Sequence, residues 1–411
     1  MSGPDAAPPL AGTTVVELGH IIAAPFAGVV LADLGADVVK VERPGAGDVV
    51  RSLGDSGRAI LDAFNRNKRS VALDLKSEGG REAYRDLAAE ADVVVENLGP
   101  DAADRLGVGY GTLAERNPGL VYCSIKGFFE GPYGDRPGMD MVAEAMSGLS
   151  AMTGDADDRP LRAGTSVADV GAAMYGVIGT VLALRERDRT GRGQRVDASL
   201  FGSMAHWTGY WTAYADLTGD DHPPLGSSHP AFALYDVFRT ADDEWVFVGV
   251  TTERHWPAFC RAVGREEWLA DERFETAAKR HEHADELVGM ARDVLRERSR
   301  SDLVAALLDE DVPAAPVNRP SDLVDDPHLR ETGLLAAVEG AGGERVRTTT
   351  TPIRGERMTT SQRRRPPALG EHTREVLSEL GYDAAAVEAL CESGAVDDGA
   401  EGDADDGAGE G

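Results

Sequence analysis

Short apolar runs rich in β-branched residues alternate with longer apolar or amphipathic segments over the first two hundred residues. Runs of this kind predict strands, whereas apolar positions repeated every three or four residues predict helices. Strands that alternate with helices predict βαβ units and a mostly parallel, Rossmann-like α/β sheet. The predicted strands are 15–18, 37–42, 70–75, 92–97, 120–127 and 194–200, and helices between them include 24–34, 78–90 and 167–187.

The pattern changes near residue 220, where the stretch 219–231 is polar, contains proline and glycine, and shows little periodicity. After it, the pattern predicts a strand at 243–250, helices at about 254–263, 284–297 and 301–309, and short strands at 333–338 and 344–352. We therefore expect a large α/β domain formed by two separate segments and a smaller inserted α/β domain. The predicted bounds are 1–220 and 335–395 for the large domain and 221–334 for the small one.

The end of the chain is predicted to form one more helix and a tail. An amphipathic helix is predicted over 369–382, with Gly381 as its stop. Residues 396–411 are rich in Asp, Glu and Gly and have almost nothing apolar to bury. They are predicted to form a disordered acidic tail.

Acidic residues dominate the charge: 71 Asp and Glu stand against 42 Lys and Arg, a net charge of −29. The tail contributes seven of these acids, so it does not account for the excess. Such a surface repels nucleic acid and anionic membranes, which excludes both as expected partners. The excess, with only five lysines, predicts a protein from a salt-adapted organism, in which concentrated salt screens the self-repulsion.

Cysteine usage and hydropathy point to the cytoplasm. Cys123, Cys260 and Cys391 are scattered without metal-ligand spacing and are expected to be reduced thiols, and no metal site is predicted. No uninterrupted apolar run reaches the 18 or so residues that a membrane span needs. The N-terminus lacks the basic and apolar blocks of a signal peptide.

Glycine-rich phosphate motifs are weak in this chain. The glycines of 189–197 follow a predicted helix and precede a strand, which is the reverse of a dinucleotide fingerprint. The segment 17–28 does run from strand to helix, but it lacks GxGxxG. Its small residues Ala23, Ala24 and Pro25 would let a ligand approach the helix N-terminus.

One carboxylate stands out in the stretch RAGTSVADVGAAMYG, residues 162–176. An aspartate at the start of a helix usually caps it. However, Thr165 and Ser166 could cap this helix instead, and the surroundings of Asp169 are small and apolar rather than solvated. The residues alone leave both roles open, a cap and a nucleophilic carboxylate.

Six blocks of sequence, spread over residues 10–392, carry a resemblance to a known family. The blocks are ELGHIIAAPFAGVVLADLGADVVKVERPGAGD, NRNKRSVALDLK, DVVVENLGPDAADRLGVGY, GMDMVAEAMSGLSAMTG, TSVADVGAAMYGVIGTVLALRERDRTGRGQRVDASL and LGEHTREVLSELG. Taken in order, they resemble the class III CoA-transferase family, which includes formyl-CoA transferase, carnitine CoA-transferases and α-methylacyl-CoA racemase. The family implies a homodimer of two interlocked chains and no permanently bound cofactor, with coenzyme A as a substrate moiety.

The resemblance implies that Asp169 is the catalytic nucleophile. It would attack an acyl-CoA thioester, form a mixed anhydride, and then carry CoA as an aspartyl-CoA thioester before an incoming acid reverses both steps. It also implies contacts with CoA, of which the two arginines suit its phosphates. The alternative is that the arginines form surface ion pairs and the leucines belong to the core. These residues are Arg43, Leu73, Leu75, Asn97, Leu98, Gly99 and Arg105.

Two departures from the family pattern bear on the reaction. The racemase branch has a histidine where this chain has Met139, and a thioether cannot transfer a proton. Formyl-CoA transferase has a glutamine where this chain has Ile22.

We expect a transferase with an acyl-CoA and a small carboxylic acid as partners: succinyl-CoA as donor and a C4–C5 acid such as mesaconate as acceptor. Arg162 or Arg239 could pair the distal carboxylate. An acyl-CoA racemase and a non-enzymatic nucleotide-binding module are the alternatives.

Overall fold

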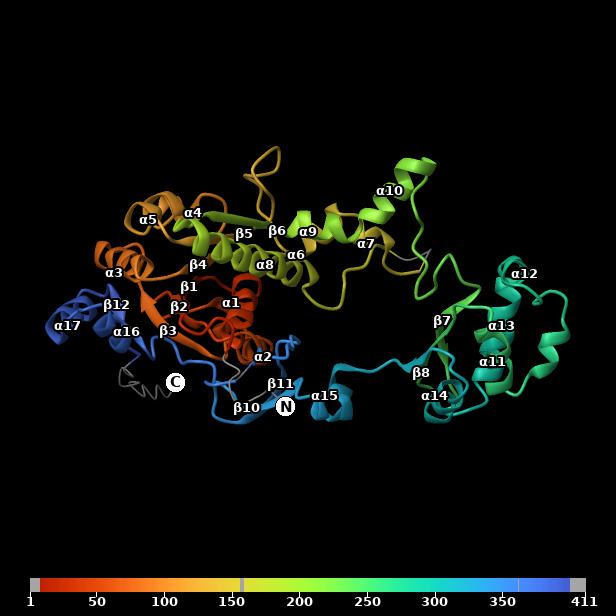
Figure 1. Ribbon diagram of the computed structural model, residues 1–411. Helices are drawn as coiled ribbons and strands as arrows, with labels where there is room; N and C mark the ends of the chain where they lie inside the picture. The colour runs from red at the N-terminus through yellow and green to blue at the C-terminus, as the bar shows by residue number, and fades with distance from the viewer. Residues whose placement is uncertain (1–7, 156–158, 361, 400–411) are drawn as a thin grey trace, which may run out of the picture. The chain divides into compact units, whose positions relative to one another are not determined.

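The computed structural model of the chain describes residues 8–155, 159–360 and 362–399 (Figure 1). The chain divides into two compact units. Unit 1 comprises Met1–Leu149, Ala163–Thr212 and Pro327–Gly411, and unit 2 comprises Ser150–Arg162 and Ala213–Asp326. The predicted domain bounds stay a prediction.

Unit 1 is built on a seven-stranded sheet in the order β12-β3-β2-β1-β4-β5-β6. Six strands run parallel, and β12 pairs antiparallel with β3 at one edge. The predicted mixed α/β fold with a mostly parallel sheet is therefore confirmed. The strands are β1 Thr14–Leu18, β2 Asp37–Glu42, β3 Lys68–Leu73, β4 Val93–Glu96, β5 Val121–Lys126, β6 Arg195–Ser199 and β12 Val396–Asp397.

Successive strand residues point to opposite faces, and both faces of this sheet are buried. Val15 and Val38 pack into one core cluster, whereas their neighbours Val16 and Val39 pack into the other. A parallel sheet covered on both sides needs such continuous apolar strands. This is why the β-branched runs were readable as strands in the sequence.

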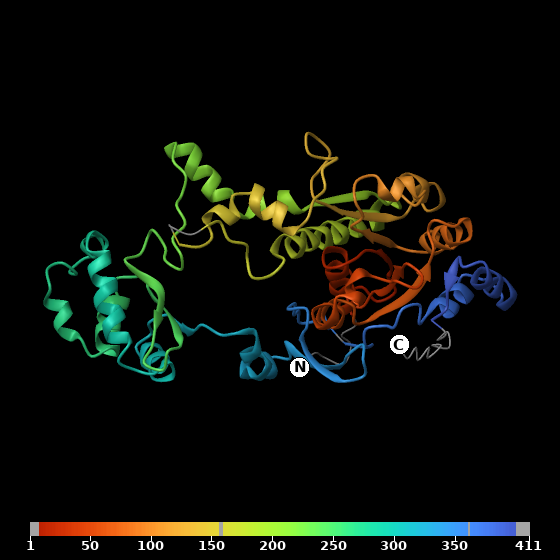
Figure 2. The same ribbon diagram turned by 180° about the vertical axis from the view of Figure 1, so that it is seen from behind.

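Helices cover each face of the sheet, as Figures 1 and 2 show from opposite sides. One face packs against α1 Ala23–Asp33, α6 Asp140–Met146, α8 Val167–Thr190 and α9 Leu200–Trp207. The other packs against α3 Glu78–Ala89, α4 Ala102–Arg105, α5 Tyr110–Arg116, α16 Thr373–Glu379 and α17 Ala384–Glu392. The other elements that lie within unit 1 are η1 Val49–Ser52, α2 Gly54–Phe64, α15 Pro327–Glu331 and the hairpin β10 Leu335–Glu339 with β11 Arg345–Thr349.

Helix α8 is long and apolar enough to cross a membrane by length and composition, and half of its most apolar window is buried in the protein. It packs against α1, α9, β5 and β6, as the central helix of a folded core does. Gly191 ends it in the left-handed conformation, with φ +71°.

Two predictions for the end of the chain are corrected. The helix predicted over 369–382 is the shorter α16, because Gly370 adopts φ +70° and interrupts any helix before Thr373. Gly381 follows it at φ +92°, as a stop should. Val396 and Asp397, predicted as the start of the disordered tail, form β12, because Val396 is buried and pairs with Leu73. Residues 400–411 lie outside the described part of the chain.

Unit 2 has an antiparallel three-stranded sheet, β7-β8-β9, packed against helices. The predicted strand 243–250 and the three predicted helices correspond to β8, α11, α13 and α14. An aromatic group around Trp256 and Phe259 fills its core. The elements within unit 2 are β7 Leu234–Arg239, β8 Trp245–Val250, β9 Ala314–Pro316, α11 His255–Ala262, η2 Glu266–Ala270, α12 Ala277–Glu282, α13 Ala284–Leu295, α14 Arg300–Asp309 and η3 Pro320–Asp325. Helices α7 Leu149–Met152 and α10 Gly209–Thr218 contain two of the four points where the chain passes between the units.

Candidate active site

The strand order of unit 1 reverses direction between β1 and β4. From β1 the chain adds β2 and β3 on one side, and it then returns to place β4, β5 and β6 on the other. The chain leaves β1 toward α1 on one face of the sheet and leaves β4 toward α4 on the other. In open α/β sheets, ligands bind in a crevice at such a switch point, so we take this point as the candidate binding crevice.

Asn97 joins the two loops that border the crevice. Its side-chain carbonyl accepts a hydrogen bond from the His20 N–H at 3.0 Å, and its amide group donates to the His20 carbonyl at 3.0 Å. The side-chain amide of Asn97 thus makes the same pair of hydrogen bonds with the backbone of His20 that a residue of a neighbouring strand would make. Burial lowers the pKa of His20 below its ordinary value, so its ring is neutral at pH 7.

Helix α8 starts on the same side of the sheet. It is joined by a short turn to the amino end of β6, so its own beginning lies toward the carboxyl ends of the strands. Its 24 residues make it about 36 Å long, which exceeds the length of the strands beneath it. The first turn of α8, which contains Asp169, therefore projects past the carboxyl edge of the sheet.

The cap of α8 comes from another helix. Ser166 occupies the N-cap position, but its side chain makes no capping hydrogen bond. Asp140, the first residue of α6, accepts a hydrogen bond from the N–H of Ala168 at 2.9 Å. The expectation that Ser166 or Thr165 would cap the helix is wrong, because a carboxylate 28 residues away satisfies this donor. Asp169 is nevertheless left free of that task.

The Asp169 carboxylate is half-buried and makes no hydrogen bond with any residue that the structure describes. Its neighbours one turn along the helix are the small, buried residues Ala172 and Ala173. Burial and then the negative charge of Asp140 raise the pKa of Asp169 from 3.8 to about 7. An unpartnered carboxylate that ionises near neutral pH is suited to nucleophilic attack.

Most of the predicted CoA contacts lie at the same edge of the sheet. Arg43 follows the end of β2, and Asn97, Leu98 and Gly99 follow β4. Because these strands are parallel neighbours of β1, the side chains and loops they carry meet along one edge. Arg43 is exposed, and the structure gives its guanidinium no ion pair with a described residue.

The remaining predicted contacts differ in accessibility. Arg105, in α4, is exposed and donates a hydrogen bond to the Pro100 carbonyl at 3.0 Å. Leu75 is half-buried just beyond β3, whereas the Leu73 side chain is buried in the core, as the alternative interpretation holds.

A buried carboxylate that the sequence interpretation missed supports the loop after β4. Glu96 accepts hydrogen bonds from the Leu98 N–H at 2.8 Å, from Ser124 at 2.7 Å and from Lys126 at 2.7 Å. Lys126 also donates to the Leu98 carbonyl at 2.7 Å. The signal in the sequence was an ionisable residue at the carboxyl end of each of two otherwise apolar strands.

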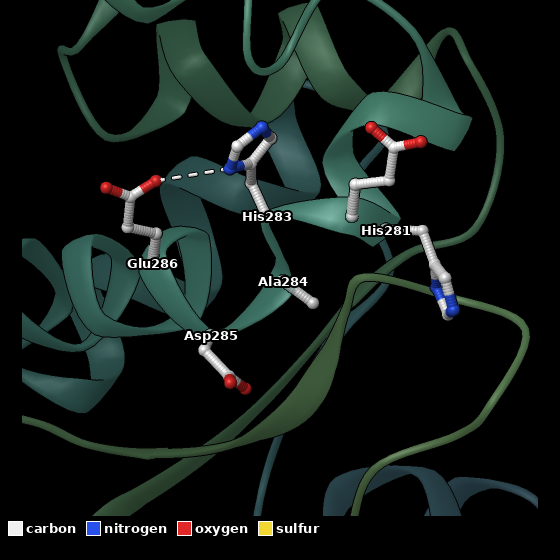
Figure 3. Close-up of a pocket in the computed structure, with 6 residues that line it drawn as sticks. His281, His283, Ala284, Asp285 and Glu286 are labelled. Atoms are coloured by element: carbon white, nitrogen blue, oxygen red, sulfur yellow. Dashed lines mark ion pairs between the residues drawn. The ribbon is translucent and has the colours of Figure 1, made fainter.

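A second hollow lies on unit 2, between α12 and α13, and is lined by residues 281–286 (Figure 3). His283 pairs with Glu286 at 3.4 Å, and His281 points away from both. Within the described residues, no group of three or more His, Cys, Asp or Glu side chains could hold a metal ion. Arg239, at the end of β7, is engaged in its own hairpin, with Asp243 at 3.0 Å and the Trp245 ring at 4.3 Å.

The chain is similar to known proteins along most of its length. The model of the family described as CoA-transferase family III matches residues 10–373. The succinate–glutarate CoA-transferase of Agrobacterium fabrum is 34% identical over 388 residues, covering 92% of this chain and 97% of the relative. The succinyl-CoA:mesaconate CoA-transferase of Haloarcula marismortui is 35% identical over 386 residues, covering 90% and 96%.

Solved structures of similar fold extend this likeness. The crystal structure of a CAIB/BAIF family protein from Brucella suis has a TM-score of 0.84 and 35% identity, covering 90% of this chain and 99% of that one. A hypothetical protein from Mycobacterium tuberculosis has a TM-score of 0.78 and 28% identity, with the same coverage.

Proposed function

The chain belongs to CoA-transferase family III and is a CoA-transferase, and we propose that it moves CoA from succinyl-CoA to a small dicarboxylic acid through a thioester on Asp169. The observation that carries the role of Asp169 is its free carboxylate, with a pKa of about 7, at the carboxyl edge of the sheet. The names of the relatives, which pair succinyl-CoA or succinate with glutarate or mesaconate, support the choice of substrates.

The proposed reaction consists of four acyl transfers. The Asp169 carboxylate attacks the thioester carbonyl of succinyl-CoA, which gives a mixed anhydride and releases CoA thiolate. The thiolate then attacks the aspartyl carbonyl, which gives aspartyl-CoA and free succinate. The acceptor carboxylate attacks this thioester and expels the thiolate again, and the thiolate attacks the acceptor's carbonyl in the new anhydride. Acyl-CoA leaves, and Asp169 regains its carboxylate.

The surroundings of Asp169 favour these four reaction steps in two ways. The anhydride and the aspartyl thioester both hydrolyse readily, and the apolar neighbours Ala172 and Ala173 keep ordered water away. The oxyanions form beside the first turn of α8, where the helix dipole favours negative charge. Arg43 and Arg105 are the exposed cations we assign to the phosphates of CoA.

A panel of donors and acceptors tests the proposal. We expect CoA transfer from succinyl-CoA to C4–C5 dicarboxylates such as mesaconate or glutarate, with monocarboxylates at least about tenfold poorer because they lack the second charge. Product acyl-CoA is measured by chromatography. Hydroxylamine converts the activated Asp169 carboxyl into a hydroxamate with release of CoA, and mass spectrometry locates this hydroxamate on the Asp169 peptide. A chain that binds acyl-CoA, transfers nothing and gives no trapped peptide would leave the nucleotide-binding reading in place.

The racemase alternative has a separate readout. Deuterium exchange at the α-carbon of a 2-methylacyl-CoA would reveal it, and we expect none. Met139, which stands where the racemase branch has a histidine, is 65% exposed and has no proton to transfer.

We propose that a second copy of the chain packs against the outer face of α8. Ile178, Val181 and Leu182 are 51%, 40% and 61% exposed and lie at the spacing of one helical stripe. A homodimer, interlocked as in the family, would bury them.

We also propose that the protein is cytoplasmic and salt-adapted, because its net charge of −29 needs screening and its three cysteines are free.

Leu182→Glu is expected to convert the dimer to monomer in light scattering at roughly 2 M KCl, because it places a charge in the apolar interface. Leu308→Glu is the matched control, since Leu308 is 53% exposed on α14 of unit 2.

Wild-type protein moved to dilute buffer is expected to melt at a lower temperature. A wild-type monomer at high salt, or a melting temperature indifferent to salt, would contradict the respective part of the proposal.

A further inference from the structure

The turn between β1 and α1 contains a strained residue. Ile21 adopts φ +63°, in the left-handed region that β-branched side chains rarely enter, because Cβ crowds the backbone there. Such a conformation persists where the surroundings hold it in place. Ile21 is 38% exposed, so burial of its own side chain is not what holds it.

Asp48 supplies the contact that holds Ile21. One carboxylate oxygen accepts a hydrogen bond from the Ile21 N–H at 3.0 Å, and the other lies 3.3 Å from the same nitrogen. The first oxygen also accepts from the Val50 N–H at 3.2 Å. The Asp48 side chain is fully buried, so no water competes for these hydrogen bonds.

Lys40 fixes Asp48 and the residue that precedes the turn. Its ammonium group lies 3.0 Å from Asp48 and 2.8 Å from Glu17, and it donates to the Gly19 carbonyl at 2.9 Å. All three charged side chains are fully buried. A side chain at Gly19 would collide with Ala24, which shows how closely the turn approaches the start of α1.

Lys68 holds the other side of the turn. It pairs with the second oxygen of Glu17 at 2.6 Å and donates to the Pro25 carbonyl, in the first turn of α1, at 2.9 Å. The buried lysines therefore hydrogen-bond to the backbone before and after Ile21, and Asp48 accepts a hydrogen bond from Ile21 itself. This arrangement fixes the wall of the crevice between β1 and β4, where Asn97 binds His20.

We propose that Asp48 is a positioning residue for CoA transfer, which acts through the N–H of Ile21 by holding the turn in its strained conformation. The inference rests on the proposed function, because the turn borders the crevice assigned to acyl-CoA. Without Asp48 the strain at Ile21 is unopposed, and the turn relaxes away from the geometry that the substrate meets.

A double-substitution cycle tests this role, since glycine adopts positive φ without strain and needs no carboxylate to hold it there. Asp48→Ala in the wild-type background is expected to lower kcat by about tenfold or more. In the Ile21→Gly background, the same substitution is expected to lower kcat by less than about threefold. Asp48→Asn, which keeps an acceptor for the Ile21 N–H, should fall between wild type and Asp48→Ala.

Hydrogen exchange of the Ile21 amide, measured by mass spectrometry on folded protein, gives a readout independent of activity. Asp48→Ala is expected to accelerate this exchange, and Asp48→Asn serves if the alanine variant does not fold. Equal losses of kcat in both backgrounds, or unchanged exchange, would overturn the inference while the proposed function stands. A wild-type chain that transfers no CoA defeats the proposed function, and the exchange measurement alone then decides whether Asp48 holds the turn.

Discussion

Asp169→Ala is expected to reduce CoA transfer by about 10³-fold or more with every donor and acceptor, because no other group could carry the aspartyl thioester. CoA binding should remain measurable by calorimetry, since the nucleotide end is assigned to other loops. Asp188→Ala is the matched control: it lies exposed near the end of the same helix, and we expect activity within about twofold of wild type. Substantial transfer by Asp169→Ala would show that the nucleophile is elsewhere.

The pH dependence of the wild-type enzyme follows from the same residue. The pKa of Asp169 is about 7, and the nucleophile is the ionised form. The rate constant kcat/KM should therefore rise with pH up to about 7 and level off above it. A profile that is flat from about pH 5 to about pH 8 would mean that this carboxylate ionises at its ordinary value.

Stability distinguishes a nucleophile from a helix cap. The folded-state pKa of Asp169 is raised, so ionising it costs stability, which is lost as pH rises from 3.8 toward about 7. Asp169→Ala removes this cost, and at about pH 8 it should stabilise the fold by about 1–3 kcal/mol, with partial exposure discounted. The gain should shrink at about pH 5. A capping aspartate would give the opposite sign, a loss of about 0.5–2 kcal/mol.

Lys40→Met is expected to lower the free energy of unfolding by about 3–5 kcal/mol, because it leaves Asp48 and Glu17 with one cation, Lys68, in a fully buried site. The carboxylates outweigh the effect of burial and raise the pKa of Lys40, so the wild-type ion pairs are intact at pH 7. Unfolding by denaturant measures the loss.

Lys279→Met is the matched control for Lys40→Met. Lys279 forms an ion pair with Glu275 at 2.7 Å, one helical turn away, and both side chains are largely exposed. Such an exposed pair contributes little to stability, so the loss for Lys279→Met should be far smaller than the loss for Lys40→Met. A loss below about 1 kcal/mol for Lys40→Met would mean that the buried network is replaceable by apolar packing, as happens in some proteins.

The amino-acid sequence by itself determined the elements and the class of fold. The valine-rich runs of β1, β2 and β4 are buried on both faces of the sheet, so their strand character is local and readable. The order of blocks also pointed to the family, and to Asp169 within it. These features depend on residues that are near neighbours in the chain.

The tertiary structure decided how the site is held, because the partners are far apart in the sequence. Asn97 binds His20 across 77 residues, and Asp140 caps α8 at Ala168 across 28. No periodicity predicts such pairs, since a hydrogen bond requires two groups to be brought within about 3 Å by the fold.

The same reason explains the parts of the fold that were missed. Val396 and Asp397 look like the start of a polar tail, and they form β12 because the exposed edge of β3 offers them backbone partners. Ile21 is strongly disfavoured at positive φ when judged by its own side chain, and a buried carboxylate 27 residues away makes that conformation stable. Local preference fixes helices and strands, whereas the turn, the cap and the edge strand depend on contacts that exist only in the folded chain.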